Sequence, residues 1–309
     1  MKLKVKKILF AFTVIVGVST FVQCKNDTSK GEATTANETP VSGKTSILVE
    51  ESIYPIVEDV VSLFEYEYDR VSIELIKKSE NEILDLIYKD SLRLAVLPRI
   101  LDSLEVSDFK GKVVPKMTYF ANDAIVFISS KNNKDSIIDY ELLVSELQSG
   151  SINKDKLLIF DNVNSSISKH FRELANVKDL SSSQVYYLSD TQQVIEYVNK
   201  NPNAIGVIGL NWLVQPSENI RVDLDNIKVL GVKNPKDNKY YKPSQKNIGE
   251  GNYPLSRKLY LLDFQGKSGL GMGFASYIAG YKGQRIVLKS GLAPFIVHPR
   301  EVIVRKNIE

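Results

Sequence analysis

The stretch VSIELIKKSENEILDLIYKDSLRLAVL, residues 71–97, decides the class of fold. Residues 71–76 alternate between apolar and polar side chains, as a strand with one buried face does, and residues 92–97 form a second, apolar strand. Between them, residues 80–89 carry apolar side chains at helical spacing. Strand, helix and strand in this order are typical of parallel strands joined by a crossover helix. The stretch therefore predicts an α/β fold.

The same pattern continues on both sides of this stretch. Residues 46–49 form a short apolar strand, and Pro55 then opens a helical pattern, at a position where the missing N–H of proline costs nothing. Further continuous apolar runs indicate strands that are buried on both faces: 124–128, 157–160 and 204–210. Gly206 and Gly209 in the last run indicate close approach of another backbone or of a ligand, with relief of side-chain packing as the commoner cause.

The N-terminus has the order of a secretion signal. Lysines at positions 2, 4, 6 and 7 precede an apolar run over residues 8–22, and Cys24 follows. Cys24 is the only cysteine of the chain, so it cannot form an internal disulfide, and lipidation after cleavage would give it a role. We expect a lipoprotein signal peptide over residues 1–23 and a polar, flexible tether over residues 24–45. An ordinary signal peptide with an incidental cysteine is the alternative.

Charge and length limit the classes of partner. The net charge of +3 is small for 309 residues, and no dense basic run with interleaved aromatic residues follows the signal. Nucleic acid is therefore not expected as a partner. About 265 residues remain after the tether, which is enough for two lobes with separate cores, and we expect a monomer.

Two loops that end a strand and begin a helix are candidate anion sites. Unpaired backbone N–H groups and the positive end of the helix dipole meet at such places. The first loop supplies Ser52, Ile53 and Tyr54, and the second loop supplies a larger set: Asp161, Ser165, Ser166 and Ser168. Ser52 and Ser165 could equally be plain helix caps, and both interpretations stay open.

Charged residues near these loops suggest how an anion would be recognised. Arg99, just after the strand at 92–97, is a candidate charge-assisted donor at a third strand end. A monoprotonated phosphate needs an acceptor for its proton, whereas sulfate does not, so a nearby carboxylate would discriminate between them. The candidates for that acceptor are Asp161, Glu51 and Asp123.

Catalysis has little support in the sequence. Only two histidines occur, His170 and His298, and His170 does not share a helix face with Ser165. No nucleophile elbow and no metal-ligand spacing is present, so we expect no enzyme activity, no metal and no cofactor. A hydrolase would need a base beside Ser165.

Three segments in the C-terminal part of the chain are distinctive: NPNAIGVIG at 201–209, YPLSRKLY at 253–260 and GYKGQRIV at 280–287. They resemble segments of the phosphate-binding components of bacterial ABC importers, in particular a lipoprotein branch common in Bacteroidetes. Ser52 to Pro55 is similar to the first phosphate loop of that family, and Ser165-Ser166-Ile167 is similar to its Ser-Gly-Thr turn.

The resemblance implies a type II periplasmic binding protein. Such a fold has two lobes, each with a central mixed sheet flanked by helices, and two hinge crossings. We expect lobe one over 46–122 plus 253–309 and lobe two over 123–252. The implied function is capture of phosphate or a similar small oxyanion between the lobes, in the cell envelope, for the permease subunits of an ABC importer in the inner membrane.

One departure from the family pattern favours a different function. Ile53 and Ile167 stand where the family usually has hydroxyl residues. An envelope sensor or scaffold that keeps the fold without binding a ligand is therefore the main alternative. A hydrolase is the remaining one.

Overall fold

The computed structural model describes residues 38–109, 113–180, 182–216 and 218–297. The predicted signal peptide, Cys24, most of the tether and His298 lie outside the described residues. The first strand begins at Gly43, within the predicted tether and three residues before the predicted strand. Gly43, Lys44 and Thr45 are in register with residues 71–73 of the next strand, so backbone pairing extends into a polar segment that hydrophobicity alone does not mark as a strand.

Most of the described strands form one mixed sheet of ten strands. Its main path has the order β2-β1-β3-β12-β4-β8-β6-β7. We call one side the first strand group: β1 (Gly43–Glu50), β2 (Val71–Lys78), β3 (Leu94–Leu97), β12 (Ser256–Asp263) and β13 (Ala293–Pro294). The second strand group comprises β6 (Leu157–Phe160), β7 (Val185–Tyr187), β8 (Ala204–Gly209) and β9 (Ile227–Val229). A separate sheet of three described strands holds β5 (Ile137–Ile138), β10 (Gly231–Lys233) and β11 (Tyr240–Tyr241).

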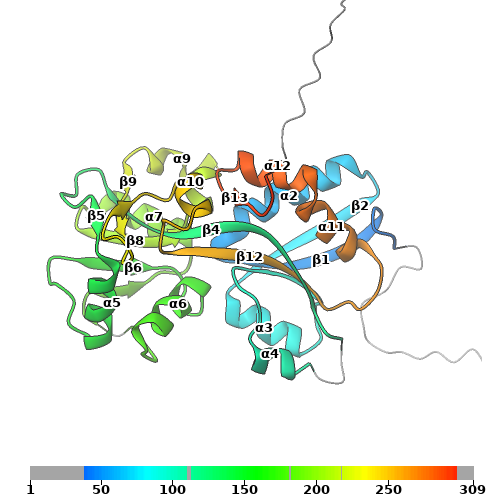
Figure 1. The fold of residues 1–309 in the computed structure, drawn as a ribbon, viewed down its shortest axis with the longest axis horizontal. Coiled ribbons are helices and arrows are strands. Elements are labelled where there is room, and N and C mark those ends of the chain that lie inside the picture. Colours follow the sequence, from blue (N-terminus) through cyan, green and yellow to red (C-terminus); the bar gives the residue numbers. More distant parts are fainter. Residues whose placement is uncertain (1–37, 110–112, 181, 217, 298–309) are drawn as a thin grey trace, which may run out of the picture. The chain divides into compact units, whose positions relative to one another are not determined.

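A single long strand, β4 (Lys116–Ser130), belongs to both groups (Figure 1). From Lys116 to Ala124 it pairs antiparallel with β12, and from Ile125 onward it pairs with β8 and β9. The parallel pairs β1–β2, β1–β3, β6–β8 and β6–β7 lie on either side of it. The α/β class predicted from residues 71–97 is therefore confirmed.

Helices cover both faces of the first strand group because side chains alternate along its strands. Ile47 and Val49 of β1 pack into the larger core cluster with α2 (Tyr54–Glu67) and α11 (Leu270–Ala279). Leu48, between them, points into a second cluster with α3 (Glu80–Tyr88). Figure 1 shows α3 and α4 (Ser103–Ser107) on the side of the sheet opposite to α2, α11 and α12 (Tyr281–Lys289).

The second strand group carries its own helices. Three of them directly follow its strands: α6 (Ser166–Ala175), α7 (Thr191–Lys200) and α8 (Asn211–Val214). α9 (Glu218–Leu224) leads into β9, α5 (Tyr140–Ser149) precedes β6, and α10 (Gln245–Gly249) contacts β4 and β13. Asp190 caps the start of α7, because its carboxylate accepts the N–H of Gln193 at 2.9 Å. The predicted division into two lobes at residues 122 and 253 stays a prediction.

The two glycines of β8 have the close neighbours that the sequence predicts. A Cβ at Gly206 would lie 2.8–2.9 Å from side chains of Val194, Ile128 and Val198. At Gly209 the neighbour is backbone: a Cβ would lie 2.3 Å from the carbonyl oxygen of Ser52. Gly209 therefore lets the second strand group meet the loop that follows β1.

We expect Gly209→Ala to lower the free energy of unfolding by about 1–3 kcal/mol, because the added methyl group must push the Ser52 carbonyl away. Urea denaturation measures this change. Gly231→Ala is the matched control: a Cβ there has its nearest neighbour at 3.6 Å, so stability should change by less than about 1 kcal/mol. Equal losses in both variants would contradict the close contact at Gly209.

Candidate functional site

Two loops far apart in the sequence meet at the junction of the two strand groups. The first follows β1 and forms a short 3-10 helix, η1 (Glu51–Ile53), that continues into α2, and the second follows β6 and begins α6. The hydroxyl oxygens of Ser52 and Ser166 lie 3.3 Å apart although 114 residues separate them. The fold thus brings together the two loops that the sequence marks as candidate anion sites.

The carboxylate of Glu50, the last residue of β1, lies between these loops. Its Oε2 accepts the backbone N–H of Ser52 at 3.0 Å and also the Ser52 hydroxyl. Its Oε1 accepts the backbone N–H of Ser166 at 3.2 Å. Two helix starts therefore donate to one fully buried negative group. Burial raises the pKa of Glu50, against the opposing effects of Arg257 and of these hydrogen bonds.

Arg257 of β12 supplies the positive charge of the cluster. Its Nη1 donates to the Ser166 hydroxyl at 3.1 Å, and its Nε and Nη2 donate to Asp123 Oδ2 at 2.9 and 2.7 Å. Asp123 is the register partner of Arg257 on β4 and is completely buried. Burial raises the pKa of Asp123, and Arg257 opposes the rise. The pair spans the point at which β4 changes partners.

Asp161, at the end of β6, is a second buried carboxyl beside Glu50. The Ser165 hydroxyl donates to its Oδ1 at 2.5 Å, and no described residue bonds its Oδ2. Burial raises the pKa of Asp161 well above its ordinary value, and the negative charge of Glu50 adds to the rise.

Ser165 and Ser168 belong mainly to the start of α6. The Ser165 hydroxyl accepts the N–H of Ser168 at 3.1 Å, which is the plain cap that the sequence left open. The Ser168 hydroxyl is buried and has no partner among the described residues. Of the second loop, Ser166 makes the hydroxyl contact with the first loop.

Glu51 ties the first loop to two helices of the second strand group. Its Oε1 accepts the N–H of Thr191 at 2.8 Å, and its carbonyl oxygen accepts the indole N–H of Trp212 at 3.1 Å. The side-chain amide of Asn211 donates to the Ser52 carbonyl at 2.5 Å. Burial raises the pKa of Glu51 to about 7.

Comparisons with known proteins agree with this architecture. A family model described as the PBP superfamily domain matches residues 34–281. The chain belongs to the PBP superfamily. A comparison with curated protein sequences finds no match.

Solved structures similar to this PBP superfamily chain include two phosphate-related proteins and one regulatory domain. A protein assigned as a phosphate ABC transporter substrate-binding protein with bound phosphate, from Clostridium perfringens, has a TM-score of 0.68 at 18% identity, and the match covers 82% of this chain and 100% of that one. An ABC-type phosphate transport receptor from Vibrio cholerae has a TM-score of 0.62 at 14% identity, with coverage of 82% and 100%.

The third similar structure is a sulfate-bound regulatory domain of OxyR2 from Vibrio vulnificus. It has a TM-score of 0.52 at 13% identity, and the match covers 79% of this chain and 99% of that one. At these identities the similarities show the fold alone, which is the type II periplasmic binding protein fold. The function of this PBP superfamily member must therefore be argued from its site.

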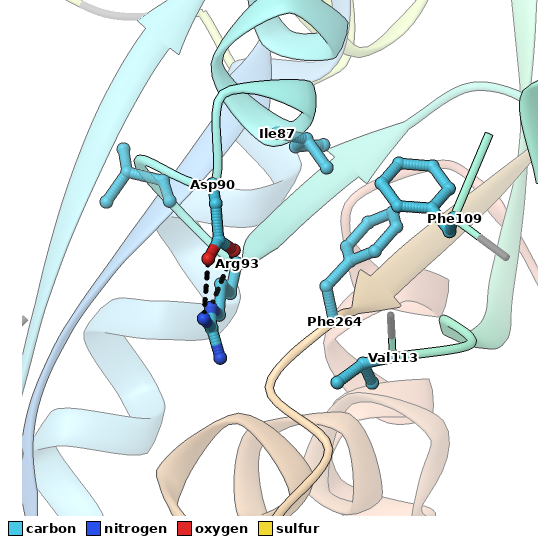
Figure 2. A pocket seen from close by; sticks show the side chains of 7 residues that line it. Ile87, Asp90, Arg93, Phe109, Val113 and Phe264 are labelled. Atoms are coloured by element: carbon cyan, nitrogen blue, oxygen red, sulfur yellow. Dashed lines mark hydrogen bonds and ion pairs between the residues drawn. The ribbon is translucent and has the colours of Figure 1, made fainter. Parts of the chain in front are cut away.

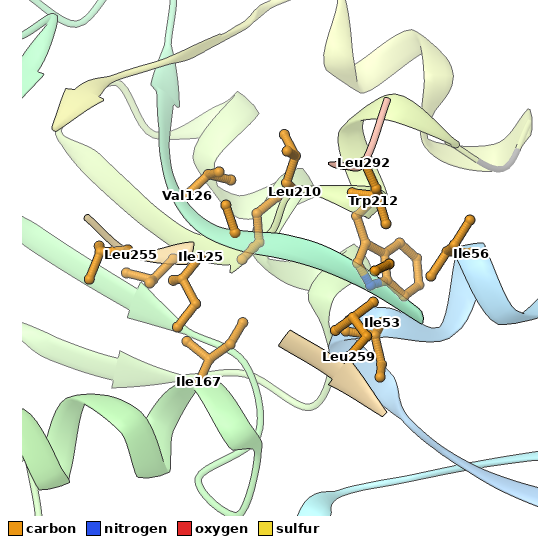
Figure 3. Packing of buried hydrophobic residues seen from close by; sticks show 14 of the residues in the cluster. Ile53, Ile56, Ile125, Val126, Ile167, Leu210, Trp212, Leu255, Leu259 and Leu292 are labelled. Carbon is orange, nitrogen blue, oxygen red and sulfur yellow. The ribbon is translucent and has the colours of Figure 1, made fainter. Parts of the chain in front are cut away.

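The two isoleucines of the site loops point into the core (Figure 3). Ile53 is completely buried and lies with Ile56, Trp212 and Leu259, and Ile167 lies near Ile125. Tyr54 packs against the same core, with its ring centroid 5.8 Å from Lys77 Nζ. The side chain of Ile53 thus belongs to the core, and the Tyr54 ring contacts the core and Lys77.

Arg99 is bonded to carboxylates rather than to the serines. Its guanidinium group bonds Glu80 at 2.8 Å and Glu105 at 2.7 Å, and Lys169 of α6 also bonds Glu80 at 2.8 Å. Because Glu80 is only 1% exposed, its carboxylate requires cations close by. The contacts of Arg99 are therefore with Glu80 and Glu105, although its position after a strand had made it a candidate donor to the anion.

Two functional residues were missed by the sequence analysis, Glu50 and Arg257. Glu50 looks like the polar end of a strand, and its neighbour Glu51 was considered instead. Arg257 stands in a strand with otherwise regular alternation, and its only signal is a cation on a strand that has to be largely buried. Its partner Asp123 was considered as an acceptor for a ligand's proton, and the structure places it against Arg257.

A cavity of about 380 Å³ lies elsewhere, where α3 ends and β12 ends (Figure 2). It is lined by Phe109, Val113 and Phe264 and by the Asp90–Arg93 ion pair, whose atoms are 2.7 and 2.9 Å apart. Its lining residues include none of the buried serines.

Within the described residues, no helix is both long enough and apolar enough to cross a membrane.

Proposed function

We propose that this chain is an extracytoplasmic solute-binding protein that captures phosphate, or a similar small oxyanion, for an ABC importer. One observation carries the proposal: the N–H groups of Ser52 and Ser166, from two separate helix starts, converge on one negatively charged group. Helix starts stabilise anions because their first N–H groups are unpaired and their dipoles point the positive end outward.

The surroundings of these N–H groups fit an oxyanion. The hydroxyls of Ser52 and Ser166 and the guanidinium group of Arg257 add donors to the same place. In its ionised form, Asp161 would accept the proton of a monoprotonated phosphate through Oδ2, which has no partner among the described residues. Sulfate has no such proton at neutral pH, so this carboxyl supports a preference for phosphate.

The proposal includes the setting of the protein. We place the mature chain in the cell envelope, anchored by a lipid on Cys24, as a monomer that delivers its ligand to permease subunits in the inner membrane. We assign it no enzyme activity and no cofactor. Membership of the PBP superfamily supports a binding role.

Calorimetric titration of the purified protein with phosphate, sulfate and molybdate tests the proposal. We expect one of the three anions to bind with a one-to-one stoichiometry and to raise the melting temperature. Ser166→Ala should weaken that binding by about tenfold, because one hydroxyl beside Arg257 is lost. Ser276→Ala, which removes an exposed hydroxyl of α11, is the control and should bind as the natural chain does.

A ligand-free sensor or scaffold is the second candidate function, and one observation favours it. The carboxylate of Glu50 already takes the N–H groups that an anion would need. No heat and no thermal shift with any of the three anions, at pH 5.5 as well as at pH 7.5, would favour the scaffold over transport.

A further inference from the structure

The carboxylate of Glu50 occupies the position between the two loops that a bound anion would take. Each of its two carboxylate oxygens serves a different helix start: Oε2 accepts from Ser52, and Oε1 accepts from Ser166. A bound oxyanion in the proposed function would need these same two N–H groups. The side chains around it are closed to solvent, since Glu50, Ser52, Ser165 and Asp161 have no exposed surface.

A second negative group beside Glu50 would be electrostatically unfavourable. Arg257 on β12 is the cation that faces Glu50, and Glu80 on α3, Asp161 after β6 and Glu51 in η1 add negative charge. Arg257 is already bonded to Asp123. An oxyanion beside an ionised Glu50 would therefore meet strong repulsion in a buried place.

We infer that Glu50 is an internal competitor for the anion site and so determines its affinity. An oxyanion binds when the Glu50 carboxylate leaves the N–H groups of Ser52 and Ser166, and a proton on Glu50 favours this exchange. The inference rests on the proposed function. Burial raises the pKa of Glu50, which makes this proton easier to acquire.

Phosphate titrations of the natural chain and of Glu50→Ala at pH 5.5, 6.5 and 7.5 test the inference. At pH 7.5 we expect Glu50→Ala to bind phosphate about tenfold to a hundredfold more tightly, the range that one lost charge-assisted competitor supplies. The ratio of the two affinities should shrink toward pH 5.5. Because the ratio is taken at each pH, the titration of phosphate itself cancels.

Two further variants keep the test sound. Glu50→Gln retains the size of the side chain but offers one acceptor oxygen instead of two, so we expect a smaller gain in phosphate affinity. This variant tests the inference if Glu50→Ala folds poorly. Glu65→Gln is the matched control, because Glu65 also accepts a backbone N–H, that of Ile73 at 2.6 Å, away from the site. It should leave phosphate affinity unchanged.

Sodium acetate provides a probe that does not depend on phosphate. Acetate should raise the melting temperature of Glu50→Ala, because it restores a carboxylate to the two N–H groups, and should not affect the natural chain. If phosphate binds the natural chain and the Glu50 variants bind it equally or more weakly, the inference is wrong and the proposed function stands. If acetate stabilises Glu50→Ala but no oxyanion binds any variant, Glu50 does fill an anion position and the transport function is wrong.

Discussion

Replacing Arg257 by methionine should lower the free energy of unfolding by about 3–5 kcal/mol, because Asp123 then remains as a buried charge without a partner. The Asp123 side chain has no exposed surface, and among the described residues Arg257 is the cation that pairs with it. Methionine keeps most of the volume of the arginine stem, so the loss reports the charge rather than a cavity. Urea denaturation at pH 7 measures it.

The same variant should also abolish binding of phosphate, since the Arg257 guanidinium group donates to the Ser166 hydroxyl at the start of α6. The double variant Arg257→Met with Asp123→Asn should recover most of the lost stability but not the binding, because it removes the unpaired charge without restoring a cation. Lys258→Met, at an exposed neighbouring position of β12, should change stability by no more than about 0.5 kcal/mol. Full stability of Arg257→Met alone would show that the buried pair is not the constraint we describe.

The second large effect is a loss of stability with rising pH that depends on Glu51. This side chain is 6% exposed, and burial raises its pKa from 4.5 to about 7 in the folded chain. The folded state thus holds the proton more tightly than the unfolded state does. Stability from this group is complete below pH 4.5 and is lost as the pH rises through about 7. At about 1.4 kcal/mol for each pKa unit, the loss amounts to about 3 kcal/mol.

Glu51→Gln isolates this contribution. Glutamine keeps an oxygen that can accept the N–H of Thr191 but carries no charge. The difference in unfolding free energy between the natural chain and the variant should fall by about 3 kcal/mol from pH 4.5 to pH 7.5, in favour of the variant. His170, whose pKa burial lowers to about 4, acts in the opposite direction below pH 6.5, but it contributes equally to both proteins and cancels. A difference that does not vary with pH would refute the role of Glu51.

The class of fold was predictable because it follows from the spacing of apolar residues in consecutive segments of the chain. The alternation in β2, the helical spacing of α3 and the apolar run of β3 appear in 27 consecutive residues, and the helix opened by Pro55 buries the apolar face that its spacing predicts. Hydrophobic periodicity could not show that β1 starts at Gly43, because the first residues of that strand are held by backbone pairing with β2.

The candidate site was predictable only in part, for a physical reason. Helix starts carry local signals, so both loops were found, and the structure brings Ser52 and Ser166 together. Charge partners carry none, because they depend on the register of strands that are distant in the sequence: Arg257 and Asp123 are 134 residues apart. Arg99 is a second example, since nothing in the sequence around it indicates that it pairs with Glu80 and Glu105.

The continuous strand β4 has a consequence for how the chain loses its structure. Its first half is a partner of β12 and its second half a partner of β8 and β9, with no loop between the halves. Unfolding of either strand group therefore removes hydrogen-bond partners from a strand that the other group also uses. Because the two groups share this backbone, we expect residues 43–294 to unfold in one cooperative transition rather than in two stages.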